Sequence, residues 1–393
     1  MKRIYLDHIA ATPLHPEAFE AMLPFLKEKY GNAQSLHSLG QEASLAVEGA
    51  RASVAALINA DPAELVFTAS GSEANNLAVK GLALAQRDKG KHIVLSAIEH
   101  SSVLNAARSL DKLGFKTTLV PVDGTGLVDP VRVEKALTKE TVLVSIMLAN
   151  SEVGTIEPIA DIASICRARA VPIHTDAVAA AGGIPVDVRA LNVDALSLAG
   201  DQFYGPKGSA ALFVKKGTRL QPLVDGGIQE AGKRGGAENV PAIVGMGQAA
   251  EIARRLLPER SERLRLLRDR LLDELPRRAS EVVVTGHRER RLPHQASFCI
   301  RFVEGEGMLL HLDMKGIAVS SGSACTSKSL KASHVLLAMG LDHATAQGSI
   351  VFSLIEGTTA ADIDYVLAEF PPIIERLRKM SPLYTEYLKE RTP

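Results

Sequence analysis

The regular alternation of apolar strand-like runs with helical stretches is the feature that most limits how this 393-residue chain can fold. The runs are rich in β-branched residues, and most are separated by stretches of helical period. Such alternation predicts an α/β domain whose largely parallel sheet lies between helices, with ligands bound beyond the carboxyl ends of the strands. The seven runs are 64–68, 91–96, 116–121, 141–147, 171–175, 195–199 and 210–214.

The last third of the chain has a different pattern, which predicts a smaller α+β domain. It begins with one long helical stretch rich in Leu and Arg. We therefore expect a large domain over 15–258 and a small domain made of 1–14 and 259–393, and we expect the polar tail 384–393 to be mobile. The predicted elements are a helix at 241–277, strands at 281–285 and 297–302, and helices at 305–314 and 359–380.

Charge and cysteine content exclude several classes of function. Lys+Arg and Asp+Glu both total 45, so no net field recruits nucleic acid or an anionic membrane. No apolar run approaches the roughly 18 residues of a membrane span, and residues 1–7 contain no apolar signal region, which predicts a cytoplasmic protein. Cys166, Cys299 and Cys325 are too few for a disulfide framework, and we expect the first two to be inert core thiols.

Polar residues follow several of the predicted strands. Gly71 and Ser72 open a helix directly after a strand, where free N–H groups suit a phosphate, although a plain capping box gives the same pattern. His100 and Asp176 each follow a strand. A His against a ring face and an Asp beside a ring nitrogen are what a pyridinium cofactor needs. Each alone could be a loop His or a helix-capping Asp, but their joint placement favours a cofactor site.

Cys325 lies in a stretch of very small residues, 320–327. Small neighbours leave a sulfur exposed, unlike an inert core cysteine. We therefore assign Cys325 a functional role.

Taken together, these segments resemble the cysteine desulfurases, relatives of the class V aminotransferases, along the whole chain. The resemblance implies a pyridoxal-phosphate (PLP) fold-type I homodimer with a mostly parallel seven-stranded sheet. Such a protein removes sulfur from L-cysteine as a persulfide on the loop cysteine, here Cys325, and passes it to an acceptor such as an iron–sulfur scaffold protein. The matching segments are 5–8, 31–32, 35–37, 98–100, 153–156, 174–177, 203–208, 238–240 and 321–327.

The sequence departs from the family where the cofactor should be attached. The family has Ser-Gly-His-Lys before Phe-Tyr-Gly-Pro-Lys-Gly, whereas residues 199–202 read Ala-Gly-Asp-Gln. A carboxamide nitrogen cannot form an imine because its lone pair is delocalised, so Gln202 cannot replace the Schiff-base lysine. Asp201 places a negative charge near the expected phosphate, a repulsion of at least about 1 kcal/mol at about 4 Å even in water. We therefore predict that covalent PLP is absent and that noncovalent binding is impaired.

Other family positions have changed with it. Ala199 and Ala237 stand where the family binds phosphate, and Ala179 stands where it has a Gln near the ring oxygen. Ser151 and Val351 replace the Asn and the Arg that hold the substrate carboxylate, which removes a strong directional contact. The retained Cys325 segment predicts a protein that handles sulfur in sulfur transfer or iron–sulfur cluster assembly. The vestigial cofactor residues are His100, Asp176, Ser72, Gly71, Gln202 and Asp201.

The sequence is also compatible with three alternative functions. It does not decide whether the chain is an enzyme. It could bind PLP noncovalently and keep weak desulfurase or lyase activity. It could be a non-catalytic structural or regulatory dimer. The pocket could also have acquired a metal, through His8, His100, Asp176 and Asp201.

Overall fold

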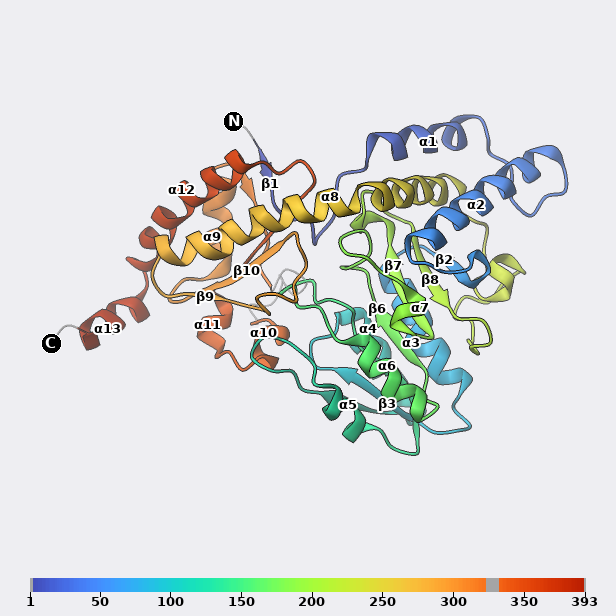
Figure 1. Ribbon diagram of the computed structural model, residues 1–393, viewed down its shortest axis with the longest axis horizontal. Helices are drawn as coiled ribbons and strands as arrows, with labels where there is room; N and C mark the ends of the chain where they lie inside the picture. Colours follow the sequence, from blue (N-terminus) through green and yellow to red (C-terminus); the bar gives the residue numbers. More distant parts are fainter. Residues whose placement is uncertain (1–2, 323–331, 392–393) are drawn as a thin grey trace.

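The structure, a computed structural model, describes residues 3–322 and 332–391. A seven-stranded sheet forms the larger domain, in the order β2-β8-β7-β6-β5-β3-β4 (Figure 1). Only β8 is antiparallel to its neighbours, so the predicted, mostly parallel sheet is confirmed. The strands are β2 (Leu65–Thr68), β3 (His92–Ser96), β4 (Lys116–Val120), β5 (Thr141–Ser145), β6 (Ile173–Asp176), β7 (Ala195–Ala199) and β8 (Ala210–Val214).

Each face of this sheet has its own hydrophobic core. On β3, Ile93 and Leu95 pack against α3 (Gly71–Ala85) and α4 (Ser101–Leu110). Val94, which lies between them, faces a second core that includes residues of α2 (Ser38–Leu57) and α6 (Ile159–Ala168). Because successive side chains of a strand point to opposite faces, a strand buried on both sides is expected to be largely apolar.

The long helix α8 (Val240–Arg278) runs from the large domain into the small one (Figure 1). Its 39 residues span about 58 Å at 1.5 Å per residue. Residues from Val240 to Ala253 belong to the core of the large sheet, whereas those from Leu264 to Leu275 belong to a separate core. One rigid helix therefore takes part in both domains.

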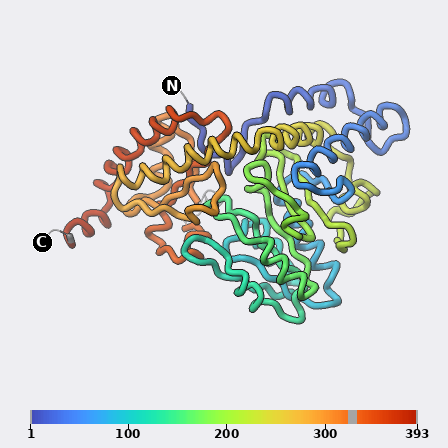
Figure 2. Tube along the Cα trace, in the orientation of Figure 1, coloured from blue at the N-terminus to red at the C-terminus, as the bar shows by residue number. Residues whose placement is uncertain are grey.

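The second core belongs to the smaller domain. An antiparallel sheet of order β12-β10-β9 forms its centre. Ile4 and Leu6 are buried in this core, so the N-terminal segment packs beside the C-terminal third of the chain (Figure 2). The elements are β1 (Ile4–Tyr5), β9 (Val282–Val284), β10 (Gln295–Ile300), α9 (Gly305–Asp313), β11 (Ile317–Ala318), β12 (Ser349–Ser353) and α12 (Ala360–Arg378).

The remaining helices complete the two domains. They are α1 (Pro16–Lys27), α5 (Pro130–Ala136), α7 (Val188–Leu191), α10 (His334–Ala338), α11 (His343–Gln347) and α13 (Pro382–Arg391). None of the helices in the described part of the chain is long and apolar enough to cross a membrane.

The tail from residue 384 is not irregular, because helix α13 continues to Arg391. The rings of Tyr384 and Tyr387 lie 5.6 and 4.6 Å from the ring of Phe302. The guanidinium of Arg378 also lies over the Tyr384 ring, 5.5 Å from its centre. These aromatic contacts hold the helix against the small domain despite its polar composition.

Candidate cofactor and sulfur site

The predicted site residues gather at one edge of the large sheet. β3, β6 and β7 are parallel, and β2 has the same direction because β8 is antiparallel to both β2 and β7. Asp176 ends β6 and Ala199 ends β7, whereas His100 and Gly71 follow β3 and β2. The shared strand direction therefore brings residues from distant parts of the chain to one edge.

A chain of hydrogen bonds joins Asp176 to His100. Asn75 Nδ2 donates to Asp176 Oδ2 at 2.6 Å and to Ser102 Oγ at 2.9 Å. Ser102 Oγ lies 2.7 Å from His100 Nδ1. Sequence reasoning missed both linking residues, although a buried Asn on the otherwise apolar face of α3 was a usable signal. The two predicted ring-binding residues thus belong to one network.

This network determines the tautomer of neutral His100. The backbone N–H of Ser102 donates to Nδ1 of the ring at 3.2 Å, so Nδ1 is an acceptor and the proton is on Nε2. Burial raises the pKa of Asp176, against the opposing influence of the Val178 N–H, His100 and Asn75. A positively charged or N–H-bearing ring beside this carboxyl would compensate for its burial.

The start of α3 packs directly on the residues that follow the neighbouring strands. A Cβ placed on Gly71 would lie 2.7 Å from Val178 Cγ2 and 3.5 Å from Ala199 Cβ, so a glycine is needed for this close approach. Ser70 caps the helix by accepting from the N–H of Glu73 at 3.1 Å. The N–H groups of Gly71 and Ser72 have no acceptor within the described part of the chain. Both the capping and the anion-binding interpretations of this sequence therefore apply.

The turn η3 (Gly200–Gln202) extends β7 and carries the two altered residues. Gln202 has its side-chain Nε2 3.5 Å from the carbonyl oxygen of Ile9, and its main-chain oxygen lies 2.9 Å from His8 Nε2. Burial raises the pKa of Asp201, although Lys207 opposes this shift. The Asp176–His100 network fits an aromatic nitrogen ring, but the turn offers no primary amine for covalent attachment. The described residues therefore fit the ring of the cofactor and do not fit a Schiff base at position 202.

The structure also shows the surroundings of Val351 and Ser151, which stand at the positions expected to bind the substrate carboxylate. Val351 is fully buried in β12, and its backbone pairs with that of Ser320. A buried aliphatic side chain supplies no hydrogen-bond donor to a carboxylate. Ser151 is half-buried, and its carbonyl oxygen accepts a hydrogen bond from the Gln295 side chain.

The three cysteines fall into two groups. Cys166 and Cys299 are buried, as expected of core thiols, and desolvation raises the pKa of each to about 12, which disfavours the reactive thiolate. Cys325 lies outside the described residues, so its role stays a prediction.

Nothing in the described ranges supports the metal alternative. Residues 3–322 and 332–391 contain no group of three His, Cys, Asp or Glu side chains placed to hold a metal ion. His8 directs its two ring nitrogens toward the carbonyl oxygens of Gln202 and Leu354. Its ring stacks on His294 with centroids 4.4 Å apart. These contacts are those of a packed structural histidine.

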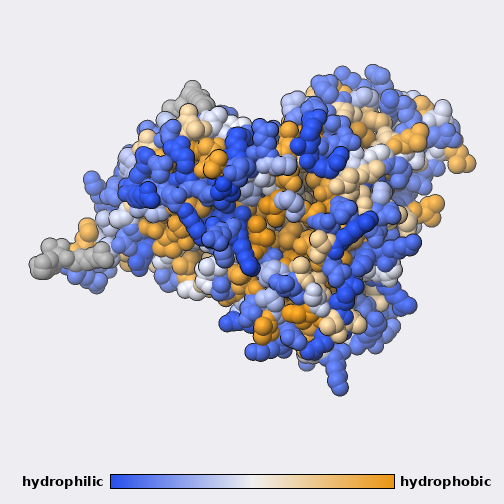
Figure 3. Space-filling view, in the orientation of Figure 1, coloured by the Kyte–Doolittle hydropathy of each residue, from blue (hydrophilic) through white to orange (hydrophobic). Residues whose placement is uncertain are grey.

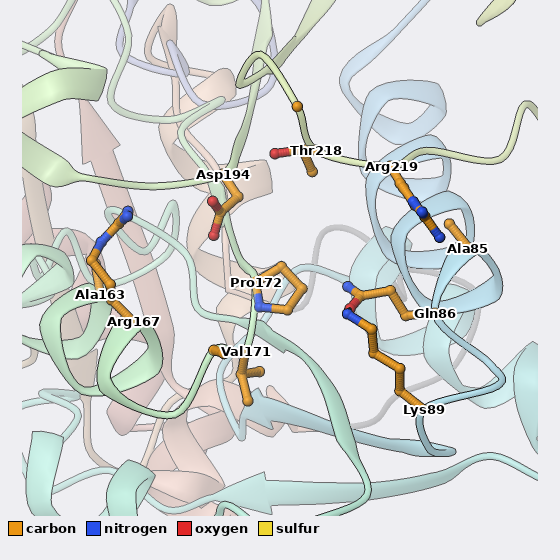
Figure 4. A pocket seen from close by; sticks show the side chains of 12 residues that line it. Ala85, Gln86, Lys89, Ala163, Arg167, Val171, Pro172, Asp194, Thr218 and Arg219 are labelled. Atoms are coloured by element: carbon orange, nitrogen blue, oxygen red, sulfur yellow. The ribbon is translucent and has the colours of Figure 1, made fainter.

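A cleft of about 570 Å³ lies at the opposite edge of the sheet (Figure 4). Pro172 and Asp194, which precede β6 and β7, lie at its centre, and Lys89 and Arg219 lie to one side of them. Because these residues come before the strands, the cleft is separate from the strand-end site. Sequence reasoning assigned no role to any of them.

Comparison with known proteins agrees with this architecture. The family model described as aminotransferase class-V matches residues 4–366. A cysteine desulfurase IscS of Dictyoglomus turgidum is 49% identical over 388 residues, covering 98% of both chains. One of Methanosarcina thermophila is 44% identical, covering 97% of this chain and 94% of the relative. Among solved structures, a NifS-like protein superposes with a TM-score of 0.90 at 36% identity, covering 96% of this chain and 100% of that one.

Proposed function

Given that the chain belongs to the class-V aminotransferase family and to its cysteine desulfurase members, we propose that it handles sulfur through Cys325 without covalently bound PLP. The turn after β7 supports the proposal, because it ends on a carboxamide, Gln202, where the resemblance implies the family's attachment lysine. We place this activity in sulfur transfer or iron–sulfur cluster assembly, in a cytoplasmic homodimer that delivers sulfur to an acceptor or scaffold protein.

The proposed sulfur chemistry needs no electron sink. The thiolate of Cys325 attacks the terminal sulfur of a small persulfide or polysulfide donor. A new S–S bond forms on Cys325, the S–S bond of the donor breaks, and the electron pair leaves with the departing thiolate, which then takes up a proton. Atoms and electrons balance without an external oxidant. An acceptor thiolate removes the outer sulfur in the same way.

Mapping persulfides on the purified protein tests this proposal. After brief exposure to inorganic polysulfide, we expect mass spectrometry to find at least about tenfold more persulfide on Cys325 than on either other cysteine, because only thiolates attack. Cys166 and Cys299 are internal controls, since burial keeps both protonated at neutral pH. Equal labelling of all three, or none on Cys325, contradicts the proposal.

The retained ring-binding network favours a second candidate, a weak desulfurase or lyase that binds PLP noncovalently. Hydrogen bonds connect the residues that would bind the cofactor ring, in the order Asp176, Asn75, Ser102 and His100. PLP in such a site would supply an electron sink, and Asp176 would stabilise a protonated ring nitrogen. Titration calorimetry with PLP distinguishes the two, because this candidate requires measurable binding that is lost in Asp176→Ala.

Exposed apolar residues support the proposed homodimer. Leu36 is 91% exposed and Ile228 is 80% exposed. The segment around Leu36 contacts the segment just before α8, because Gln34 Nε2 donates to Glu238 Oε1 at 2.9 Å. Figure 3 shows hydrophobic residues at this end of the molecule, around α1 and α2. Exposed apolar side chains that gather in one patch are typical of surfaces that bind another protein.

Substituting these residues by acids should therefore weaken the dimer. We expect Leu36→Glu and Ile228→Glu each to raise the dimer dissociation constant by about tenfold or more, which is about 1.4 kcal/mol. Light scattering over a dilution series measures this change. Leu310→Glu is the matched control, since Leu310 is 67% exposed on α9 of the small domain. A dimer unaffected by the first two substitutions contradicts the assigned surface.

A further inference from the structure

Glu152 is a buried carboxyl that contacts both ends of the segment that carries Cys325. Ser333 Oγ donates to Glu152 Oε2 at 2.7 Å, and both side chains are buried. The other carboxyl oxygen lies against the backbone of Gly322, where an added Cβ would approach it to 1.8 Å. Only glycine fits at position 322 while the carboxyl stays in place. The last described residues before 323 and those just after 331 therefore meet the same side chain.

Glu152 is itself fixed to the strand end that carries His100. The backbone N–H of Glu152 donates to Asn150 Oδ1 at 2.8 Å, and Asn150 Nδ2 donates to the carbonyl oxygen of Ile98 at 3.0 Å. A second link runs beside it, because His334 Nε2 donates to the carbonyl oxygen of Glu99 at 3.0 Å. Two separate hydrogen-bonded routes thus join the segment after residue 331 to the residues immediately before His100.

The side chain of Ser333 also organises the start of α10. It accepts from the backbone N–H of Val335 at 3.1 Å and of Leu336 at 3.4 Å. Its hydroxyl proton is therefore free to be donated to Glu152. The Ser333 side chain thus caps α10 and is itself held by the carboxyl of Glu152. Loss of the carboxyl would leave a buried hydroxyl donor without its acceptor.

The surroundings of this carboxyl favour its uncharged form. Burial raises its pKa to about 8, and the hydrogen bond from Ser333 opposes this shift. Glu152 Oε1 has no hydrogen-bond partner in the part of the chain that the structure describes. Ionisation there would leave a charge without compensation. A glutamine therefore reproduces the size and the neutral charge of this side chain.

We propose that Glu152 is a positioning residue that holds both attachment points of the Cys325 segment, Gly322 and Ser333, beside the strand end that carries His100. It touches neither substrate nor thiol in this role. The inference deepens the proposed function, on which the importance of Cys325 rests.

Alkylation of Cys325 in the full-length protein tests this role without requiring any sulfur chemistry. We expect iodoacetamide to react with Cys325 in Glu152→Ala about fivefold or more faster than in wild type, because Gly322 and Ser333, between which Cys325 lies in the sequence, then lose their shared contact with the carboxyl. Glu152→Asp keeps an acid but withdraws it from Ser333, so it should shift the rate in the same direction. This variant serves as a second test if the alanine variant folds poorly. Glu152→Gln should restore the wild-type rate to within about twofold, since its carbonyl can still accept from Ser333.

Glu157 offers a matched control. It is a buried carboxyl whose pKa burial also raises to about 8, but it accepts from the backbone N–H of Val128 and not from Ser333. Glu157→Ala should lower the thermal midpoint as Glu152→Ala does, yet leave the alkylation rate of Cys325 unchanged. Equal rates in Glu152→Ala, Glu152→Asp and wild type, or equal shifts in Glu152→Ala and Glu157→Ala, overturn the proposal. The alkylation rate can be measured whether or not Cys325 accepts sulfur. Failure of the role proposed for Glu152 is therefore distinguishable from failure of the proposed function.

Discussion

Replacing Gln202 by lysine should allow covalent attachment of PLP, which we propose the wild-type chain lacks. A primary amine has an available lone pair, whereas the amide lone pair is delocalised into its carbonyl. The side chain at 202 projects from the turn that directly follows β7, at the same edge of the sheet as Asp176 and His100. After incubation with PLP and reduction with borohydride, mass spectrometry should find the cofactor on residue 202 of the Gln202→Lys variant and none on the wild type.

A variant with the same added charge shows whether PLP attachment needs a primary amine or only a positive charge at position 202. Gln202→Arg also adds a cation beside Asp201, but a guanidinium does not form a stable imine, so we expect no covalent cofactor. Lys207 in the wild-type chain is a second control, because it lies beyond the turn and is exposed. Covalent PLP on wild-type protein, or its absence from Gln202→Lys, would show that the turn after β7 does not decide attachment.

The sheet could be predicted because burial on both faces makes most of its central strands largely apolar. The run at 195–199 coincides with β7, and that at 210–214 coincides with β8. Ser349–Ser353 was not predicted as a strand, although it forms β12 beside β10. Helix α13 was missed because its stability comes from contacts with Phe302, which is distant in the sequence.

The site could be predicted only in part. His100 and Asp176 follow strands, and the parallel topology then requires that they meet at one edge. Their connection through Asn75 and Ser102 depends on how α3 and α4 pack, which short-range patterns do not specify. The contact between Glu152 and Ser333 joins residues 181 positions apart in the sequence, so no local motif could have indicated it.

The retained and altered residues together distinguish this chain from its relatives. The ring-binding network is complete, yet the residues at 201 and 202 do not fit cofactor attachment, and buried Val351 cannot hold a carboxylate. A desulfurase needs all of these functions at once, and the loss of groups that act as a unit removes nearly all activity. On these grounds we propose that membership of the family does not carry its reaction over to this chain.

Sulfide release from L-cysteine is the most direct test of this account. The purified wild-type protein is incubated with L-cysteine, PLP and a reducing thiol, beside a lysine-containing cysteine desulfurase as the positive control. We predict a rate at least about 100-fold below that control and indistinguishable from the rate with heat-denatured protein. Robust sulfide and alanine production by the wild-type chain, lost in Cys325→Ala, would contradict the central claim that its sulfur comes from elsewhere.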